Sequence, residues 1–349
     1  IKAVLPFEPR TLVVVDTNEN ALAELTRDLR STNGLFVPKD YVPYPMDFAS
    51  PVFEKMFRKR GGFDVVANFS AHKHVRSEKD IYSIEALLQN NVLHAKILLD
   101  LLEEFPPEEY FCVSTDKAAN PVNIMGASKR IMEDVIFSYS DKFPIKTARF
   151  ANVAFSNGSL PAGFLSRISK LQPISAPSDV KRYFVSPEES GQICMLACML
   201  GRNREIFFPK LSGKQMMTFD TIARELLQEQ GYEVIECETD KEAVEKAEQL
   251  KKGSKQYPVR FSESDTSGEK SFEEFYTDTE SIDMNRFKAL GVIVDKKTTD
   301  KYKIEKLFSE LMMEFEKEEA TKNKVVQIIK EYLPNFEHNE KGKTLDCKM

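Results

Sequence analysis

Short apolar segments alternate with segments of helical spacing along the first 150 residues, and this alternation limits the fold more than any other feature of the sequence. In Thr11–Asp16, β-branched and apolar residues end in an acid, and leucines then recur at helical spacing. The pattern continues with expected strands at 41–44, 63–68, 110–114 and 145–150 and expected helices at 51–60, 81–104 and 125–139. Strands that are apolar throughout and alternate with helices are typical of a parallel sheet covered on both faces. We therefore predict an α/β fold with a doubly wound parallel sheet, which binds ligands at the carboxyl ends of its strands.

The regular alternation ends after residue 150. A turn sequence at 157–159 and three prolines between positions 161 and 177 are followed by a helical segment at 188–200, a strand-like run at 206–208 and a helix at 219–228. We predict an N-terminal domain over residues 1–155, and a smaller substrate-binding lobe over 156–280 that is interleaved with a returning sheet strand near 205–209. A C-terminal extension over 281–349 is expected to contain a helix at 302–317. The Lys/Glu-rich stretch 238–255 is expected to be a solvated helix face.

The composition is that of a globular chain large enough to bury a sizeable core. Lysine and arginine (49) against aspartate and glutamate (55) give a net charge of −6, which argues against nucleic acid as a partner because phosphate binding needs clustered cations. The longest apolar stretch, Ile193 to Leu200, is far shorter than the roughly 20 residues of a membrane span. Five scattered cysteines without a C-x-x-C pair indicate neither a disulfide framework nor a zinc site. We therefore expect a cytoplasmic protein with no membrane span in this chain.

Two acids follow expected strands near the start of the chain. Asp16 ends the first strand, where a carboxylate can accept hydrogen bonds from a dinucleotide's ribose hydroxyls, although it can equally belong to a plain helix cap. A carboxylate there favours NAD over NADP, because a 2′-phosphate would meet a like charge. Asp47 can contact adenine or serve only in a turn. The glycine-rich loop belongs about 20 residues before Asp16, ahead of Ile1, so we expect a fragment without the first strand and that loop.

The segment 114–130 contains the polar residues with the clearest chemical potential. Asp116 and Lys117 can both reach one ligand only where the strand has ended and the chain turns, and a proline follows shortly. Met125 and Lys129 are four residues apart and therefore share one face of the next helix. Asp116, Lys117 and Lys129 are thus expected to converge on the ligand crevice. The alternative is an ordinary surface cluster of ion pairs.

This segment resembles the extended short-chain dehydrogenase/reductases, and within them the polysaccharide-biosynthesis (CapD-like) branch of UDP-N-acetylglucosamine 4,6-dehydratases. The resemblance spans roughly residues 11–275. Its most specific block is 114–130, and further blocks lie at 68–75, 89–92, 149–153, 181–184 and 268–270. It implies a Rossmann fold, a nicotinamide cofactor that is NAD or NADP, and a nucleotide-sugar substrate.

The resemblance implies a role for each residue of the central block. Lys129 resembles the lysine that holds the nicotinamide ribose, Asp116 the general acid and Lys117 the general base. Thr115 resembles the residue that hydrogen-bonds the sugar C4 oxygen. Met125 occupies the position of the tyrosine in ordinary dehydrogenases, and a thioether cannot accept a proton. Some dehydratases of this branch share the methionine, so the group that deprotonates the C4 hydroxyl stays open.

Residues outside this block are assigned by the same resemblance. Ser70 and Lys73 are assigned to cofactor binding, and Lys73 corresponds to a position where the family approaches the cofactor or the sugar. Asn152 resembles a residue that contacts the substrate diphosphate, while Arg182 and Glu269 are further candidates for substrate binding. Asn91, which lies in the block at 89–92, is expected to be a structural hydrogen-bonder behind the active site.

The resemblance leads to one main hypothesis and two alternatives. The chain is expected to be a lyase that converts UDP-N-acetylglucosamine to a 4-keto-6-deoxy sugar nucleotide for surface polysaccharide biosynthesis. The alternatives are a 4-epimerase or reductase of the same superfamily, and a non-catalytic protein that binds the nucleotide sugar or NAD(P).

Two patterns bear on metals and partners. The pair His72 and His74 lacks a third ligand at metal spacing, so no metal is expected. The apolar stripe of the 302–317 helix is expected to dock on the body of the protein or on a neighbouring subunit of a homo-oligomer.

Overall fold

The computed structural model describes residues 1–211, 216–264 and 273–339. The chain divides into two compact units, and each is described by itself. Unit 1 comprises Ile1–Arg149, Gly191–Pro209 and Phe275–Glu337. Unit 2 comprises Phe150–Ser190, Lys210–Glu274 and His338–Met349, apart from the residues outside the described ranges.

Unit 1 is built on a six-stranded sheet, whose order is β13-β14-β9-β5-β4-β3. Its strands are β3 (Val65–Asn68), β4 (Glu109–Thr115), β5 (Ile145–Phe150), β9 (Glu205–Pro209), β13 (Ile282–Asp283) and β14 (Leu290–Ile293). Strand β3 pairs with β4 and β5 pairs with β9 in parallel, as the sequence predicts. Strands β14 and β13 add an antiparallel edge that the sequence analysis did not predict.

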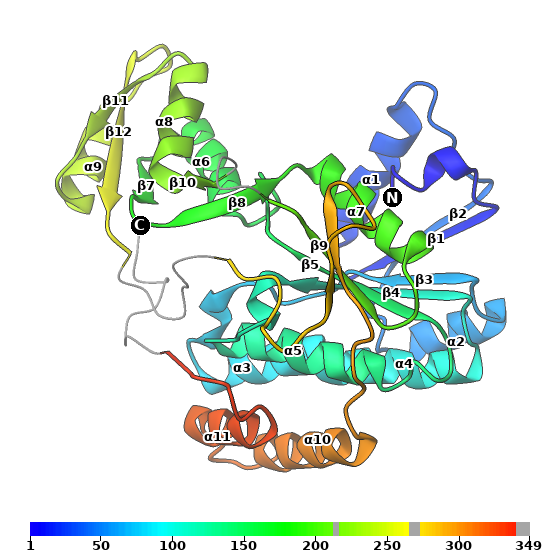
Figure 1. The fold of residues 1–349 in the computed structure, drawn as a ribbon. Coiled ribbons are helices and arrows are strands. Elements are labelled where there is room, and N and C mark those ends of the chain that lie inside the picture. The colour runs from blue at the N-terminus through cyan, green and yellow to red at the C-terminus, as the bar shows by residue number, and fades with distance from the viewer. Residues whose placement is uncertain (212–215, 265–272, 340–349) are drawn as a thin grey trace. The chain divides into compact units, whose positions relative to one another are not determined.

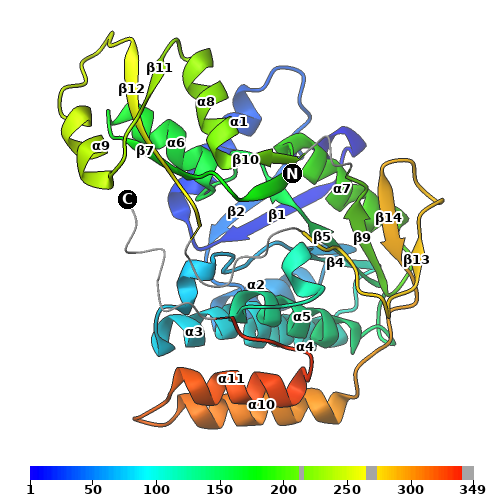
Figure 2. The same ribbon diagram turned by 60° about the vertical axis from the view of Figure 1, so that its left-hand side comes forward.

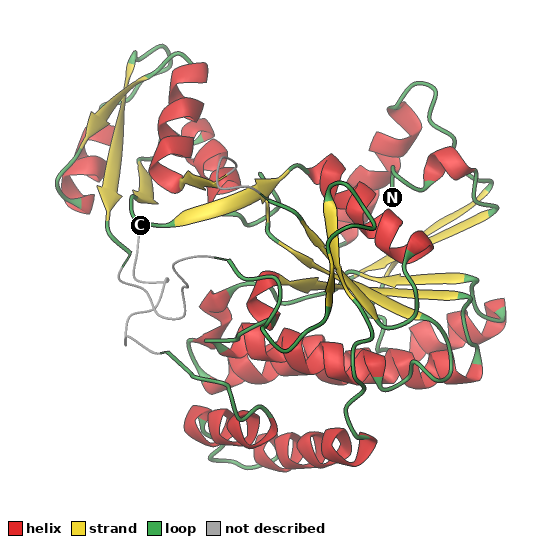
Figure 3. Ribbon diagram, in the orientation of Figure 1, coloured by secondary structure: helices red, strands yellow, loops and turns green. Residues whose placement is uncertain are grey.

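Helices cover both faces of this sheet (Figures 1 and 3). One face carries α2 (Pro51–Arg60), α3 (Ile81–Leu88), α4 (His94–Glu104) and α5 (Ile124–Phe137), and α1 (Glu19–Ser31) and α7 (Pro187–Leu200) lie on the other. Short polar side chains start several of these helices, because Asn18, Ser50, Asp80 and Asn123 each accept a backbone N–H of the first turn. The doubly wound architecture predicted from the sequence is therefore confirmed.

Two further strands of unit 1 form a separate parallel pair, β1 (Thr11–Asp16) and β2 (Asp40–Pro45). Among the described residues, β1 pairs only with β2 and β3 pairs only with β4, so each has one open edge. Residues 11–15 of β1 are half-buried although four of them are apolar. The doubly wound order has one more strand between the strands that correspond to β1 and β3.

The expected single helix over 81–104 is interrupted. Between α3 and α4, Gln89–Leu93 forms a π-helical turn, and the backbone N–H of His94 donates to the carbonyl oxygen of Gln89. Asn91 lies in this turn and is buried. A π-turn keeps the apolar spacing of the flanking helices nearly unchanged, which is why periodicity alone did not reveal it.

The predicted domain boundaries at 155 and 280 differ from the division into two units. The returning strand near 205–209 is β9, as expected, but α7 also continues into unit 1, and the chain returns to unit 1 at Phe275. The expected C-terminal extension is part of unit 1: β13 and β14 join its sheet, and α10 (Lys301–Phe315) and α11 (Lys322–Tyr332) form a helical hairpin. Figures 1 and 2 both show this hairpin along the outer side of α3, α4 and α5.

Unit 2 has two small three-stranded sheets, β10-β8-β6 and β11-β12-β7. Its elements are β6 (Asn152–Val153), α6 (Leu160–Ser169), β7 (Ile174–Pro177), β8 (Lys181–Val185), β10 (Met216–Thr218), α8 (Phe219–Glu229), β11 (Glu233–Glu236), α9 (Asp240–Ala247) and β12 (Gln256–Ser262). An apolar cluster that includes Phe164, Leu227 and Tyr257 forms its core. The stretch 238–255, expected to be a helix face, contains the short α9 and the loop before β12.

No helix in the described ranges is long and apolar enough to span a membrane. The same ranges contain no group of three or more His, Cys, Asp or Glu side chains that could hold a metal ion.

Candidate active site

The carboxyl end of β4 brings a carboxylate, an ammonium and a hydroxyl together. Thr115 ends the strand, and Asp116–Ala118 forms a single 3₁₀ turn directly after it. Asp116 Oδ1 accepts a hydrogen bond from Thr115 Oγ1 at 2.6 Å and one from Lys117 Nζ at 3.2 Å. Asp116 is only 3% exposed, so this ion pair is not an ordinary surface pair. An acid and a base thus lie side by side where parallel strands present their ligand sites.

Lys129 reaches the same strand from α5. Its Nζ donates to the carbonyl oxygen of Val113 at 3.1 Å and contacts Met132 Sδ at 3.6 Å. The side chain is buried, and the loss of hydration lowers the pKa of Lys129 below its ordinary value. The ammonium is therefore held against the end of β4 in an environment that favours loss of its proton.

Met125 lies one turn before Lys129 and is also buried. Its backbone N–H donates to Glu78 Oε1 at 3.0 Å, and its carbonyl oxygen accepts the Ser128 hydroxyl at 2.7 Å. The side chain supplies no group that could take up a proton. Of the residues that the sequence analysis named in this segment, Asp116, Lys117 and Lys129 are the ones that can exchange a proton.

The two acids proposed to contact a dinucleotide both take part in turns. Asp16 lies at the end of β1, where its Oδ1 accepts the backbone N–H of Asn18 at 2.8 Å, and Asn18 in turn caps α1. Asp47 lies between β2 and α2, and its Oδ1 accepts the N–H of Ala49 at 2.8 Å. Each carboxylate has further acceptor capacity beyond these local bonds.

The surroundings of two residues in the loop after β3, Ser70 and Lys73, indicate whether the site fits a cofactor. Ser70 Oγ is shielded from solvent and has no hydrogen-bond partner among the described residues. Buried hydroxyls normally find partners, so an unsatisfied one at the end of a parallel strand suits a bound polar ligand. Surrounding protein atoms displace water from Lys73 and lower the pKa of its ammonium. The unsatisfied Ser70 hydroxyl and the partly desolvated Lys73, together with the buried Lys129, fit a polar cofactor such as a nicotinamide dinucleotide.

Asn91 secures this loop from the π-turn. Its Oδ1 accepts the backbone N–H of His72 at 2.8 Å, and its Nδ2 donates to the His72 carbonyl oxygen and to Ser128 Oγ, each at 3.0 Å. The side chain therefore ties the loop after β3 to α5, which is the structural role expected for it.

The candidate substrate residues lie in unit 2. Asn152 in β6 donates through Nδ2 to Glu273 Oε1, and Glu273 Oε2 accepts the backbone N–H of Tyr183 at 2.8 Å. Glu273, which the sequence analysis did not single out, thus holds the Asn152 amide in place. Arg182 in β8 is buried and donates to the carbonyl oxygen of Lys181. Glu269 falls outside the described residues.

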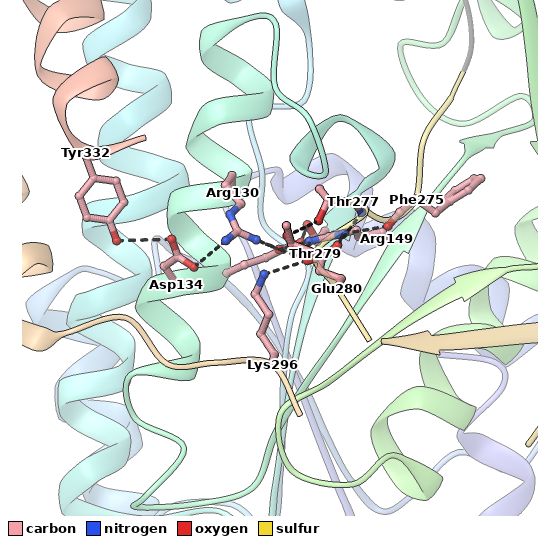
Figure 4. A network of polar contacts seen from close by, with 11 residues as sticks. Arg130, Asp134, Arg149, Phe275, Thr277, Thr279, Glu280, Lys296 and Tyr332 are labelled. Carbon is pink, nitrogen blue, oxygen red and sulfur yellow. Dashed lines mark hydrogen bonds and ion pairs between the residues drawn. The ribbon is translucent and has the colours of Figure 1, made fainter. Parts of the chain in front are cut away.

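A buried ionic network supports β4 from behind, and the sequence analysis did not predict it (Figure 4). All five N–H donors of Arg149 are used: they bond to the carboxylates of Glu133 and Glu280 and to the carbonyl oxygen of Phe275. Glu133 Oε1 also accepts the hydroxyl of Ser114 at 2.7 Å. Lys296 Nζ lies 2.8 Å from Glu280 Oε1. The network therefore joins the chain around residues 275–296 to the residue directly before Thr115.

The charges of this network lower the pKa values of its acids. Arg149 and Lys296 hold the pKa of Glu280 well below its ordinary value, against the opposing effect of burial. Arg149 has the same effect on the pKa of Glu133, which is fully buried. Two signals in the sequence could have revealed the network. Glu133 lies four residues after Lys129 on the same helix, and Arg149 opens one of the resemblance blocks.

Comparisons with known proteins agree with this architecture. The family profile of polysaccharide biosynthesis proteins matches residues 1–295. An uncharacterized membrane protein of Methanocaldococcus jannaschii is 30% identical over 241 residues, 66% of this chain and 68% of its own length. The capsular polysaccharide biosynthesis protein CapD of Staphylococcus aureus is 28% identical over 236 residues. That match covers 66% of this chain but only 38% of CapD.

Solved structures show the same fold. Pen from Bacillus thuringiensis superposes with a TM-score of 0.67 at 18% identity, over 89% of this chain and 92% of that one. The dTDP-glucose 4,6-dehydratase DesIV of Streptomyces venezuelae gives a TM-score of 0.57 at 17% identity, over 78% and 81% of the two chains. The chain therefore belongs to the polysaccharide biosynthesis protein family, its similarity to CapD supports the CapD-like branch, and it has the fold of the extended short-chain dehydrogenase/reductases.

Proposed function

We propose that the protein is an NAD(P)-dependent nucleotide-sugar 4,6-dehydratase that acts on UDP-N-acetylglucosamine for surface polysaccharide biosynthesis. The observation that carries this proposal is the shielded acid–base pair Asp116–Lys117 at the end of β4. A simple dehydrogenase needs no second acid–base pair beyond the group that handles the hydroxyl proton. Elimination of water needs both a base and an acid, and Asp116 and Lys117 supply them side by side.

Asp116 and Lys117 can together carry out the proton transfers of the elimination. In the proposed elimination, the Lys117 amine takes the C5 proton, which a ketone at C4 makes acidic. Asp116 in its protonated form gives its proton to the departing C6 oxygen, so water leaves and the pair becomes carboxylate and ammonium. When a hydride reaches C6, Lys117 returns its proton to C5, and the proton released from the C4 hydroxyl during its oxidation restores the acid form of Asp116. The 3.2 Å separation of Lys117 Nζ and Asp116 Oδ1 allows direct proton exchange between the partners.

The residues that would hold the cofactor are Lys129 and Ser70 at the nicotinamide side, Lys73 beside them, and Asp16 and Asp47 toward the adenosine. When bound, the nicotinamide supplies redox chemistry that removes hydride from C4 and delivers it to C6, without net oxidation of the sugar. The Asp16 carboxylate favours NAD. The Streptomyces dehydratase is described with NAD bound, which supports a nicotinamide cofactor here.

Thr115 in unit 1 and Asn152 and Arg182 in unit 2 carry the remaining proposed roles. Thr115 would hydrogen-bond the C4 oxygen, while the amide of Asn152 and the guanidinium of Arg182 would hold the substrate diphosphate, with Glu269 as a further contact. We place the reaction in the cytoplasm and expect a homo-oligomer. Relatives and structural neighbours that are named as nucleotide-sugar enzymes support a substrate of the nucleotide-sugar class.

The deciding experiment is incubation of the protein with NAD(P) and UDP-N-acetylglucosamine in deuterated water, followed by NMR and mass spectrometry. The expected product has lost one water, carries deuterium at C5 and has a 4-keto-6-deoxy sugar. A product that differs only at C4 would favour the epimerase alternative. Cofactor binding without any change in the sugar would favour a binding protein.

Replacing Lys117 separates these alternatives further. Lys117→Ala should lower the rate of dehydration by about 10²- to 10⁴-fold, since it removes the proposed base. The control is Lys96→Ala, which removes a surface lysine paired with Asp100 and should leave the rate unchanged. A rate for Lys117→Ala within about threefold of the wild type would contradict the assigned role.

A further inference from the structure

Helix α5, which carries Met125 and Lys129, is buried on every side. Of its residues, all but Arg130 are buried, although a helix that covers a sheet normally leaves one polar face in water. Figures 1 and 2 show the reason, because the α10–α11 hairpin runs along its outer side. Both the hairpin and α5 belong to unit 1.

The hairpin touches α5 and its surroundings at both ends. Lys322, the first residue of α11, donates from Nζ to the carbonyl oxygen of Glu78 at 3.1 Å. Tyr332 at the other end of α11 lies with its hydroxyl 3.5 Å from Asp134 Oδ2. Lys301, the first residue of α10, lies over the ring of Tyr139, 5.3 Å from its centre and just beyond the end of α5. The hairpin therefore spans the length of the helix.

Glu78 connects the hairpin to the first turn of α5. While its carbonyl oxygen accepts Lys322, its side-chain Oε1 accepts the backbone N–H of Met125. N–H groups in the first turn of a helix have no partner within the helix, and a carboxylate there also interacts favourably with the helix dipole. Glu78 thus holds the first turn of α5 together with the Asn123 cap.

The position of this first turn determines where Lys129 lies. Met125 and Lys129 are one helical turn apart on the same face, so a rotation or shift of the first turn moves both. Within the described part of the chain, Lys129 Nζ is held by one backbone carbonyl oxygen, that of Val113, together with a thioether contact. A small displacement of α5 would break this contact and admit water to the ammonium.

We propose that the α10–α11 hairpin is a positioning element of the candidate active site and that it acts through Glu78, which joins Lys322 to the first turn of α5. Glu78 and Lys322 are positioning residues and touch neither substrate nor cofactor. The proposal rests on the proposed function only for its effect on turnover. Its effect on Lys129 can be measured without any substrate.

The test compares Lys322→Met, Glu78→Ala and Glu78→Gln with the control Lys324→Met. Lys324 is an exposed lysine of the same helix, where it bonds Gln327. The first readout is the rate at which acetic anhydride modifies Lys129, followed by peptide mass spectrometry with Lys96 as an internal reference. The second is the dehydration rate across pH, with kcat and KM determined separately.

Lys322→Met and Glu78→Ala should raise the modification rate of Lys129 about three- to tenfold and lower kcat by a similar factor, with KM little changed, as expected for one lost hydrogen bond. The alkaline limit of the kcat profile should move, because hydration raises the pKa of Lys129. Glu78→Gln keeps an oxygen that can accept the Met125 N–H and should restore most of both readouts. Lys324→Met should match the wild type.

Equal modification of Lys129 in Lys322→Met and Lys324→Met would overturn the proposal. So would a Glu78→Gln variant as impaired as Glu78→Ala. If Glu78→Ala does not fold, Lys322→Met decides alone, because it changes only the hairpin side of the contact. If the wild type does not convert the sugar, the proposed function fails, while the modification rates still decide the role of the hairpin.

Discussion

The two units fill their interiors in different ways. Unit 2 has a core of aromatic and aliphatic side chains between its helices and a small sheet. Unit 1 also buries many apolar residues, but behind β4 it buries Arg149 together with the carboxylates of Glu133 and Glu280. Apolar packing is non-directional, whereas a charged hydrogen bond fixes the orientation of both partners.

The unit that buries charged side chains is also the unit that contains the candidate acid–base residues. The acid–base pair Asp116–Lys117 and Lys129 lie in unit 1, close in sequence to the residues of the network: Ser114 precedes Thr115, and Glu133 follows Lys129 by one turn. Desolvation makes a buried ion pair a weak source of stability, but loss of one partner leaves a costly unpaired charge. Unit 1 is therefore expected to be sensitive to changes of charge and unit 2 to changes of volume.

The largest effect is expected for Arg149→Met. This change leaves Glu133 and Glu280 buried without their main partner and should lower the free energy of unfolding of unit 1 by about 3–5 kcal/mol. Hydrogen exchange with mass spectrometry can follow each unit separately, which suits a chain without tryptophan. The control is Arg224→Met in unit 2, whose ion pair with Glu236 is solvent-exposed and should contribute under about 1 kcal/mol. Similar losses for both variants would remove the distinction between the units.

The complementary change is Leu227→Ala in unit 2. Leu227 is fully buried in the apolar cluster, so its truncation leaves a cavity and should cost about 3 kcal/mol. Faster hydrogen exchange is expected in the peptides of α8 and β12, with those of β4 and β5 unchanged. Leu165→Ala, a truncation of a leucine that is 42% exposed, provides the control and should have little effect. An equal response in β4 would show that the units do not unfold independently.

The smallest effect is a pH dependence from Glu280. The pKa of this carboxyl is lower in the folded protein than its ordinary value of 4.5, so the folded state binds the proton less readily than the unfolded state. Its stabilising contribution is therefore complete above about pH 5 and is lost as the pH falls below the unfolded value. The free energy of unfolding of wild type should exceed that of Glu280→Gln by about 1 kcal/mol at pH 7.

That difference should shrink steadily between pH 5 and pH 3 in denaturant titrations of unit 1. Glu236→Gln, which changes an exposed acid of unit 2, should show almost no difference at either pH. A Glu280 difference that grows in acid would mean that its pKa is raised on folding, contrary to the expectation.

Local patterns predicted most of unit 1. The strands β1 to β5 and helices α2 and α5 follow from apolar runs, helical spacing and capping residues, all of which are local properties of the chain. The β13–β14 edge, α11 and both sheets of unit 2 were not predicted. The strands are short and their pairing depends on contacts between separate segments, so no local period reports it. The helix α11 has apolar residues at helical spacing that the sequence analysis missed.

Some residues of the candidate site could likewise be predicted from local sequence, and others could not. Asp116, Lys117 and Lys129 could be named from the sequence because they lie within one short segment around a turn. Glu78, Glu273 and Glu280 could not, because each reaches its partner from a distant part of the chain: Glu78 bonds Met125, and Glu273 bonds Asn152. Single acidic residues in polar loops carry no signal that separates them from their exposed neighbours.

The π-helical turn at Gln89–Leu93 makes the length of this helical segment as important as its composition. A regular helix would need one residue fewer to make the same turn. Deletion of Asn90 would remove the extra residue and leave a regular helix, so later buried residues such as Leu98 and Leu99 would keep their faces. A deletion inside α4 has no extra residue to absorb it, and every residue after it would turn by about 100°. A one-residue deletion should therefore be tolerated better at the π-turn than inside α4, where it would disturb the packing of the rest of the helix.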